Sequence, residues 1–163
     1  MTHTISRGKG RRTVRTAVAI GAATLGLVAL SACEKPTPRA TVTVGSDTVS
    51  TEAACYEDGK ALSQKEVLSC IQKEGSTSIT VGEGDMLRIG VDPEIAEKGW
   101  VLFLGEQPAV SEPIKKTYRS FSSDGLFSRA GGGSAKSVRL GLVEYDGEQY
   151  RGVWTIELER ETD

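Results

Sequence analysis

The strongest constraint on the fold is an alternating pattern near the C-terminus of this 163-residue chain. Apolar side chains occupy every second position on either side of the turn-forming pair Asp146-Gly147: Val138, Leu140 and Leu142 before it, and Trp154, Ile156 and Leu158 after it. Alternate side chains of a β-strand point to the same face, so the pattern predicts a hairpin with one buried face. The residues between them should face outward and make the returning strand amphipathic: Val153, Thr155, Glu157 and Glu159.

Further short strands are predicted along the chain, with turn signals between them. Their ranges are 41–44, 48–51, 78–81, 86–91, 100–104 and 116–121. Residues 100–104 (WVLFL) are apolar throughout, which is typical of a central strand buried on both faces. Several short strands at these intervals predict a mainly β fold, a single antiparallel β-sandwich of immunoglobulin-like type over residues 40–163. Residues 122–134, with their Gly131–Gly133 run, are expected to form a flexible connection.

One short helix is expected at residues 64–73, besides a signal helix at the N-terminus. Ser63 and Glu66 have the spacing of a capping box, in which each side chain binds the other residue's backbone N–H. Val67, Leu68 and Ile71 would then form its inner face. A strand is the alternative here, and residues 92–99 are predicted to be a loop with one helical turn.

The N-terminus has the parts of an export signal in order. Basic residues end at Arg15, and the run Ala17–Leu30 carries no charge but is too short for a permanent transmembrane helix. Leu30-Ser31-Ala32-Cys33 follows directly and resembles the bacterial lipobox, in which the cysteine thiol receives a diacylglyceryl group. This resemblance implies cleavage between Ala32 and Cys33. An ordinary secretory signal with an incidental cysteine is the alternative.

The predicted organisation is a lipoprotein signal at 1–32, a lipidated cysteine and tether at 33–39, and the β domain. Two acyl chains would hold the chain on the outer face of the cytoplasmic membrane, since one chain binds only marginally. General secretion is the expected export route. The pair Arg11-Arg12 leaves a twin-arginine route open.

The remaining cysteines and the single histidine restrict the chemistry. In an oxidising compartment, Cys55 and Cys70 are expected to form a disulfide, with a redox or metal role as the alternative. The only histidine, His3, falls in the predicted signal, so the mature chain cannot build a histidine-dependent catalytic or metal site. Catalysis by carboxylates alone stays open. No catalytic residue, cofactor or metal is predicted.

Charge excludes one class of partner. Removing residues 1–32, which carry five of the 20 basic residues and no acid, leaves 131 residues with 15 basic and 22 acidic side chains. The whole-chain net charge of −2 thus becomes −7 in the mature part. An acidic domain repels a phosphate backbone, so no nucleic-acid partner is expected.

Three surface candidates follow, each with a structural alternative. Leu126-Phe127 beside the glycine run could contact a partner or fold back on the core. Asp92, Glu94 and Glu97 could bind Ca²⁺, but they lack EF-hand spacing and are expected to be solvated. Lys115-Lys116 and Arg119 could touch anionic lipid headgroups or form ordinary surface.

The lipobox, the proline-containing tether, the early cysteine pair and the hairpin of residues 138–160 together resemble uncharacterised actinobacterial lipoproteins that carry a small β-sandwich. That resemblance implies anchoring in a Gram-positive envelope and implies no activity. Chagasin-like protease inhibitors share a loop-rich sandwich, but their recognition loops are absent here.

Three functions are therefore compared. The favoured one is a non-enzymatic, membrane-anchored binding or accessory module with an envelope protein as partner. A solute-binding lipoprotein usually needs two lobes around a cleft, for which 131 residues do not suffice. An envelope hydrolase would need two acids converging in a pocket, one with a raised pKa.

Overall fold

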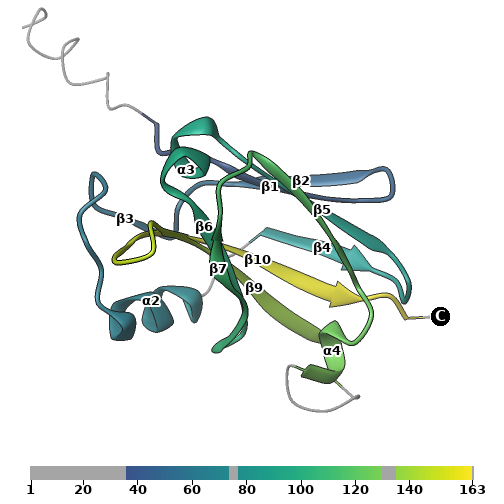
Figure 1. Ribbon diagram of the computed structural model, residues 1–163. Coiled ribbons are helices and arrows are strands. Elements are labelled where there is room, and N and C mark those ends of the chain that lie inside the picture. Colours follow the sequence, from purple (N-terminus) through teal and green to yellow (C-terminus); the bar gives the residue numbers. More distant parts are fainter. Residues whose placement is uncertain (1–35, 74–76, 130–134, 163) are drawn as a thin grey trace, which may run out of the picture. The chain divides into compact units, whose positions relative to one another are not determined.

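Two β-sheets pack face to face in residues 37–163 (Figure 1). The computed structural model describes residues 36–73, 77–129 and 135–162, so the predicted signal, Ala32 and Cys33 lie outside the described part, as does the Gly131–Gly133 run. The smaller sheet has the strand order β2-β1-β5-β8. Its strands are β1 (Ala40–Val44), β2 (Asp47–Thr51), β5 (Met86–Val91) and β8 (Tyr118–Ser122).

The larger, six-stranded sheet has the order β3-β10-β9-β6-β7, and β4 lies against β10. Its strands are β3 (Cys55–Tyr56), β4 (Thr77–Val81), β6 (Trp100–Leu104), β7 (Gln107–Ile114), β9 (Ser137–Tyr145) and β10 (Tyr150–Arg160). The predicted mainly β sandwich is confirmed. Its pairs are antiparallel except β4 with β10, which is parallel. The immunoglobulin-like topology stays a prediction.

Strand β7 was not predicted, because its sequence QPAVSEPI contains two prolines and little alternation. The structure shows why a strand tolerates them there. β7 pairs only with β6 and forms an edge of the sheet, where a missing backbone N–H breaks no ladder. Most of its side chains are exposed, which removes the apolar periodicity on which strand prediction depends.

The C-terminal hairpin is confirmed, and its register pairs the residues predicted to share the buried face. Leu142 lies opposite Trp154, Leu140 opposite Ile156, and Val138 opposite Leu158. The Asp146 carboxylate accepts hydrogen bonds from the backbone N–H groups of Gln149 (2.8 Å) and Glu148 (2.9 Å). These bonds favour the ionised form and hold the pKa of Asp146 below its ordinary value.

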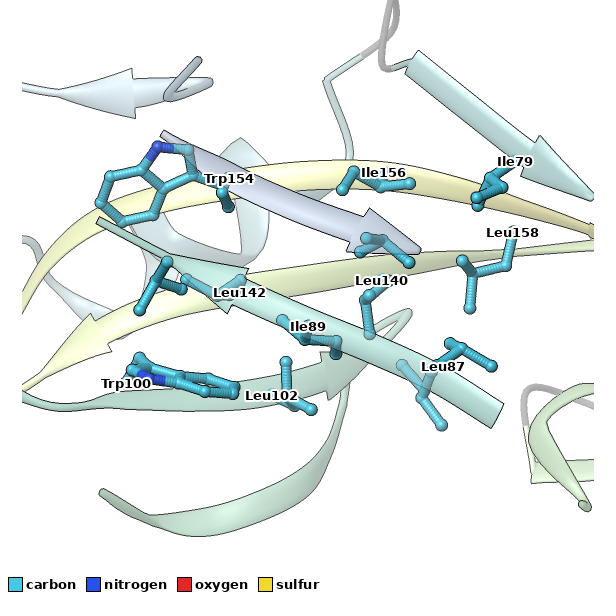
Figure 2. Packing of buried hydrophobic residues seen from close by; sticks show 14 of the residues in the cluster. Ile79, Leu87, Ile89, Trp100, Leu102, Leu140, Leu142, Trp154, Ile156 and Leu158 are labelled. Atoms are coloured by element: carbon cyan, nitrogen blue, oxygen red, sulfur yellow. The ribbon is translucent and has the colours of Figure 1, made fainter. Parts of the chain in front are cut away.

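The main core lies between the two sheets. Figure 2 shows Leu87 and Ile89 of β5 facing the side chains of the larger sheet, with Trp100 and Trp154 toward one end. Both tryptophans are almost fully buried, and each indole N–H finds a backbone carbonyl: Trp154 donates to Pro38 (2.7 Å) and Trp100 to Lys116 (2.8 Å). The predicted inner face of β10 is confirmed.

The predicted exposure of the outer face of β10 is wrong for Val153 and Thr155 and confirmed for Glu159. Val153 is fully buried and Thr155 is 4% exposed, because helix α2 (Gln64–Ile71) covers this side of the sheet. Further along the strand, Glu157 is half-buried and paired with Arg139 at 3.0 Å, and Glu159 is exposed. A second, smaller core therefore lies between α2 and β6, β9 and β10. Its buried members are Val67, Cys70, Ile71, Val101, Phe103, Val143 and Val153.

Helix α2 begins with the predicted capping box. The Ser63 side chain accepts from the Glu66 N–H at 3.3 Å, and the Glu66 carboxylate accepts from the Ser63 N–H at 2.7 Å. The strand alternative is therefore wrong, although the helix ends at Ile71 instead of residue 73. The predicted helical turn is α3 (Pro93–Lys98), and a further short helix, α4 (Leu126–Arg129), lies in the stretch predicted to be an irregular connection.

Within residues 36–73, 77–129 and 135–162, no helix combines the length and hydrophobicity needed to cross a membrane.

Candidate interaction surfaces

The predicted disulfide is confirmed. Cys55 of β3 and Cys70 of α2 are bonded, with 6.0 Å between their Cα atoms. The bond therefore joins the short helix to the edge strand beside β10, at the margin of the smaller core. Cys70 is buried and Cys55 half-buried, and a bond at such a place stabilises the fold and leaves neither thiol free to bind a metal.

The structure places Leu126 and Phe127 at the start of α4. Phe127 is only 7% exposed and belongs to the main core, while Leu126 is half-buried against the same core. The Arg160 guanidinium lies over the Phe127 ring, 5.4 Å from its centroid. These residues seal the sandwich between the sheets, and the small exposed part of Phe127 lines a hollow at the surface.

A hollow of about 450 Å³ lies beside Phe127, where the β4–β5 turn meets the stretch after β8. Its lining includes Gly82, Glu83, Ser123, Arg160 and Glu161. Asp85 is near as well: its carboxylate accepts from the Gly82 N–H at 2.8 Å, and the Ser123 hydroxyl donates to the Gly82 carbonyl at 2.9 Å. These bonds fix the turn that carries the chain from one sheet to the other.

The acids of this hollow do not resemble a carboxylate catalytic pair. Glu83 and Glu161 are both exposed, whereas a general acid is desolvated so that its carboxyl stays protonated near neutral pH. The hollow thus gives the hydrolase hypothesis no support from burial.

Among the described residues, Glu144 on β9 is the acid that is buried, at one end of the main core. It is 1% exposed, and its Oε1 lies 2.8 Å from the Nζ of Lys98, whose side chain is 41% exposed. Oε1 makes this ion pair without an aligned hydrogen bond. Because a buried carboxylate must be compensated, Lys98 closes the end of the sandwich over it. Sequence alternation on β9 could have placed Glu144 inward, but it gave no sign of the partner on α3.

Of the three acids predicted to be solvated around α3, Glu94 and Glu97 are exposed, and Asp92 is half-buried with a structural role. The Asp92 carboxylate accepts the Arg39 N–H at 2.8 Å, which joins the start of β1 to the end of β5. No group of three or more carboxylate, cysteine or histidine side chains within the described ranges is placed to hold a metal ion.

A second hollow, of about 590 Å³, lies where β7 passes into β8. Its lining contains three basic residues and no acid: Pro113, Ile114, Lys115, Lys116, Tyr118, Arg119 and Ser120. We call Lys115, Lys116, Tyr118 and Arg119 the β7–β8 patch. All four are exposed, and Tyr118 at 51% is one of two large hydrophobic side chains exposed in the described part of the chain.

The three cations of the β7–β8 patch lie together within residues 115–119, and no acid lines their hollow. No carboxylate of the described residues forms an ion pair with Lys115, Lys116 or Arg119. The Arg119 guanidinium lies 5.5 Å from the Phe121 ring centroid, which orients it along β8. Sequence reasoning found the three cations. It missed Tyr118, because an alternating strand hides which aromatic side chain is left uncovered.

No protein-family model, no curated protein and no solved structure matches this chain.

Proposed function

We propose that this chain is an extracytoplasmic lipoprotein of the bacterial envelope, anchored to the membrane through Cys33, with a β-sandwich that serves as a non-enzymatic binding or accessory module. The observation that carries the anchor is the sequence Leu30-Ser31-Ala32-Cys33, placed directly after the uncharged run of residues 17–30. Diacylglycerol on the cysteine thiol would then provide two acyl chains, enough for stable retention.

The disulfide supports the proposed compartment. Disulfides persist in secreted and envelope proteins and are rare in the reducing cytosol. The Cys55–Cys70 bond holds a helix on the β-sheet, so the fold itself benefits from an oxidising environment. Export and the architecture of the domain therefore agree.

The composition of the mature chain supports a binding module over an enzyme. Its histidine-free sequence lacks the commonest general acid–base side chain, and the acids lining the described hollow are exposed. A small domain on a short tether is suited to contacting a neighbouring envelope protein, and we propose such a partner.

Substitution of Cys33 tests the anchor. In a bacterial host fed labelled palmitate, the wild-type chain should be processed, labelled and retained in the membrane fraction after a high-salt wash. Cys33→Ala should lose the label and leave that fraction. The double variant Cys55→Ala/Cys70→Ala is the matched control, since it also loses thiols but should keep the label. A Cys33→Ala chain that is labelled and retained like wild type would overturn the proposal.

Crosslinking in intact cells tests the module. A partner captured reproducibly by the wild type, and lost when the anchor is replaced by a cleavable secretory signal, supports an envelope contact. Failure to capture any protein with crosslinkers of different reach counts against the binding role and leaves the anchor result untouched.

A further inference from the structure

The starting observation is where the β7–β8 patch lies relative to the point at which the chain enters the domain. In the smaller sheet, β1 pairs with β5 and β5 pairs with β8. Ala40 at the start of β1 lies opposite Val91 at the end of β5, and the Val91 N–H donates to the Thr117 carbonyl at 2.9 Å. The start of β1 and the start of β8 are therefore two strand spacings apart, about 10 Å.

Buried contacts fix both sites in place. The Trp154 indole holds the Pro38 carbonyl, and the Trp100 indole holds the Lys116 carbonyl. Helix α3 lies beside the start of β1 (Figure 1), where the Asp92 N–H donates to the Arg39 carbonyl at 3.1 Å. The patch and the entry point of the chain thus belong to one rigid end of the sandwich.

Covalent geometry sets how far this end can be from the membrane. Pro38 lies five positions after Cys33, and an extended chain spans at most about 17 Å over those five steps. If Cys33 carries the lipid, as proposed above, the β7–β8 patch is confined to within a few Debye lengths of the headgroups, about 8–10 Å each at physiological salt. The tether supplies a high local concentration of membrane surface.

The patch has the chemistry that such a surface selects. Basic side chains gain affinity from anionic phospholipids, and tyrosine is enriched at the level of the headgroups because its ring is apolar and its hydroxyl polar. The mature chain carries a net charge of −7 and is repelled as a whole, so only a locally basic end can face an anionic leaflet. Helix α3 contributes nearby acids at the same end, Asp92, Glu94 and Glu97, which moderate the attraction.

We infer that the β7–β8 patch is a docking surface for anionic phospholipid headgroups, which sets the anchored domain on the membrane with its tether end down. This inference rests on the proposed anchor at Cys33. In this arrangement the end of the sandwich that carries Pro38 and the β7–β8 patch orients the domain. The opposite end, with the hollow at Gly82, then faces away from the membrane, toward other envelope proteins.

Paramagnetic lipids in nanodiscs test the orientation residue by residue. The mature lipidated protein, isotopically labelled, is placed in discs of phosphatidylcholine alone or mixed with phosphatidylglycerol, each with a gadolinium-chelating lipid. In the anionic discs we expect the strongest relaxation enhancement at residues 113–120 and 38–40, and a weaker, more uniform pattern in the neutral discs. Salt at about 1 M should abolish the difference by screening.

Charge variants decide whether the patch causes the orientation. Each basic side chain near an anionic surface changes partitioning about fivefold, so Lys115→Gln/Lys116→Gln/Arg119→Gln should lower the docked-to-undocked ratio about a hundredfold. The matched control Lys65→Gln/Lys73→Gln/Lys136→Gln removes three exposed cations elsewhere and should keep the wild-type pattern. Tyr118→Ser should lower the ratio less, and the amide spectrum of each variant verifies its fold.

The outcomes separate the two proposals. An acylated chain that shows the same enhancement in both discs, an enhancement centred on another face, or a pattern unchanged in the triple patch variant overturns the docking surface alone. A mature chain whose mass shows no acyl group at Cys33 overturns the anchor and the docking surface together.

Discussion

The six-stranded sheet carries a buried cluster on each face, but the two clusters are covered by different means. The inner face packs on a second sheet through large side chains, among them Trp100 and Trp154. The outer face is covered by α2, a helix of eight residues. A helix of that length is not stable alone in water, so it depends on its contacts with the sheet. The disulfide to β3 and the capping box at Ser63 are the devices that keep it there.

The comparison teaches that one sheet can be stabilised by two cores with different weak points. The stability of the main core, which we call the inner core here, should fall when side-chain volume is removed, because rigid sheets collapse poorly around a cavity. The stability of the smaller core, the outer core, should fall when an interaction that holds α2 against the sheet is removed. The predictions below separate these two responses.

The largest effect is expected for Trp154→Ala in the inner core. The side chain is 1% exposed and its indole donates to Pro38, so its removal creates a large cavity and leaves a carbonyl without its donor. We expect a loss of about 3–5 kcal/mol in the free energy of unfolding, measured by urea titration. Trp154→Phe, which keeps a ring, should lose clearly less. A loss under about 1 kcal/mol for Trp154→Ala would show that the inner core is not the main source of stability.

Removal of the disulfide should come next. Cys55→Ala/Cys70→Ala opens a loop with a sequence separation of 15, which costs about 3 kcal/mol in the chain-entropy model. Hydrogen exchange should show which part of the fold is weakened. Amides of α2 should exchange much faster, whereas exchange of the amides of β9 and β10 should rise only as far as global stability falls. Reducing agent should destabilise the wild type and leave the double variant unchanged. Uniform loss of protection across helix and sheet would contradict a separate outer core.

Gly141→Ala tests how closely α2 packs against the sheet in the outer core. A Cβ at Gly141 would lie 2.8 Å from Cγ1 of Ile71, so the glycine lets α2 approach the sheet closely. Overpacking here should cost about 1–3 kcal/mol. In the background Ile71→Ala, where those side-chain atoms are gone, the added methyl should be neutral or favourable. A double-mutant cycle measures this coupling, and additive effects would mean that helix and sheet do not touch at this point.

The inner face could be predicted from the sequence because its signal is local. Leu140, Leu142, Trp154 and Ile156 alternate within their own strands, and period-2 alternation depends on nothing beyond the backbone of a strand. Burial of the outer face could not be predicted in this way, because the helix that covers β10 there, α2, lies some 80 residues earlier in the chain. Val153 did stand among residues expected to be outward, yet a single valine does not reveal what covers it.

The candidate surface was foreseen in part for the same reason. Lys115, Lys116 and Arg119 are cations close together in sequence, so they could be recognised as a group. Their nearness to the entry of the chain at Pro38 depends on strand order in the smaller sheet, which sequence spacing does not specify. Phe127 folds back on the core, the second of the two interpretations left open by the sequence, because a loop residue has no periodicity that marks its burial.

The smallest effect concerns the start of α2 and its dependence on pH. Hydrogen bonds from the Ser63 hydroxyl and the Ser63 backbone N–H favour the carboxylate of Glu66 and lower its pKa below the ordinary 4.5. Because the folded pKa is the lower one, the stabilisation is complete above about pH 4.5 and is lost as the pH falls through the folded value. Glu66→Gln should therefore flatten the acid limb of stability against pH.

Two measurements check this last expectation. In an NMR titration, the pKa of Glu66 should be depressed in the wild type and should move toward its ordinary value in Ser63→Ala, which removes the hydroxyl donor. In urea titrations, wild type and Glu66→Gln should differ at neutral pH and converge in acid. Curves that stay parallel down to pH 3 would mean that the charge of Glu66 adds nothing to holding α2, and that the disulfide and the smaller core suffice to keep the outer face covered.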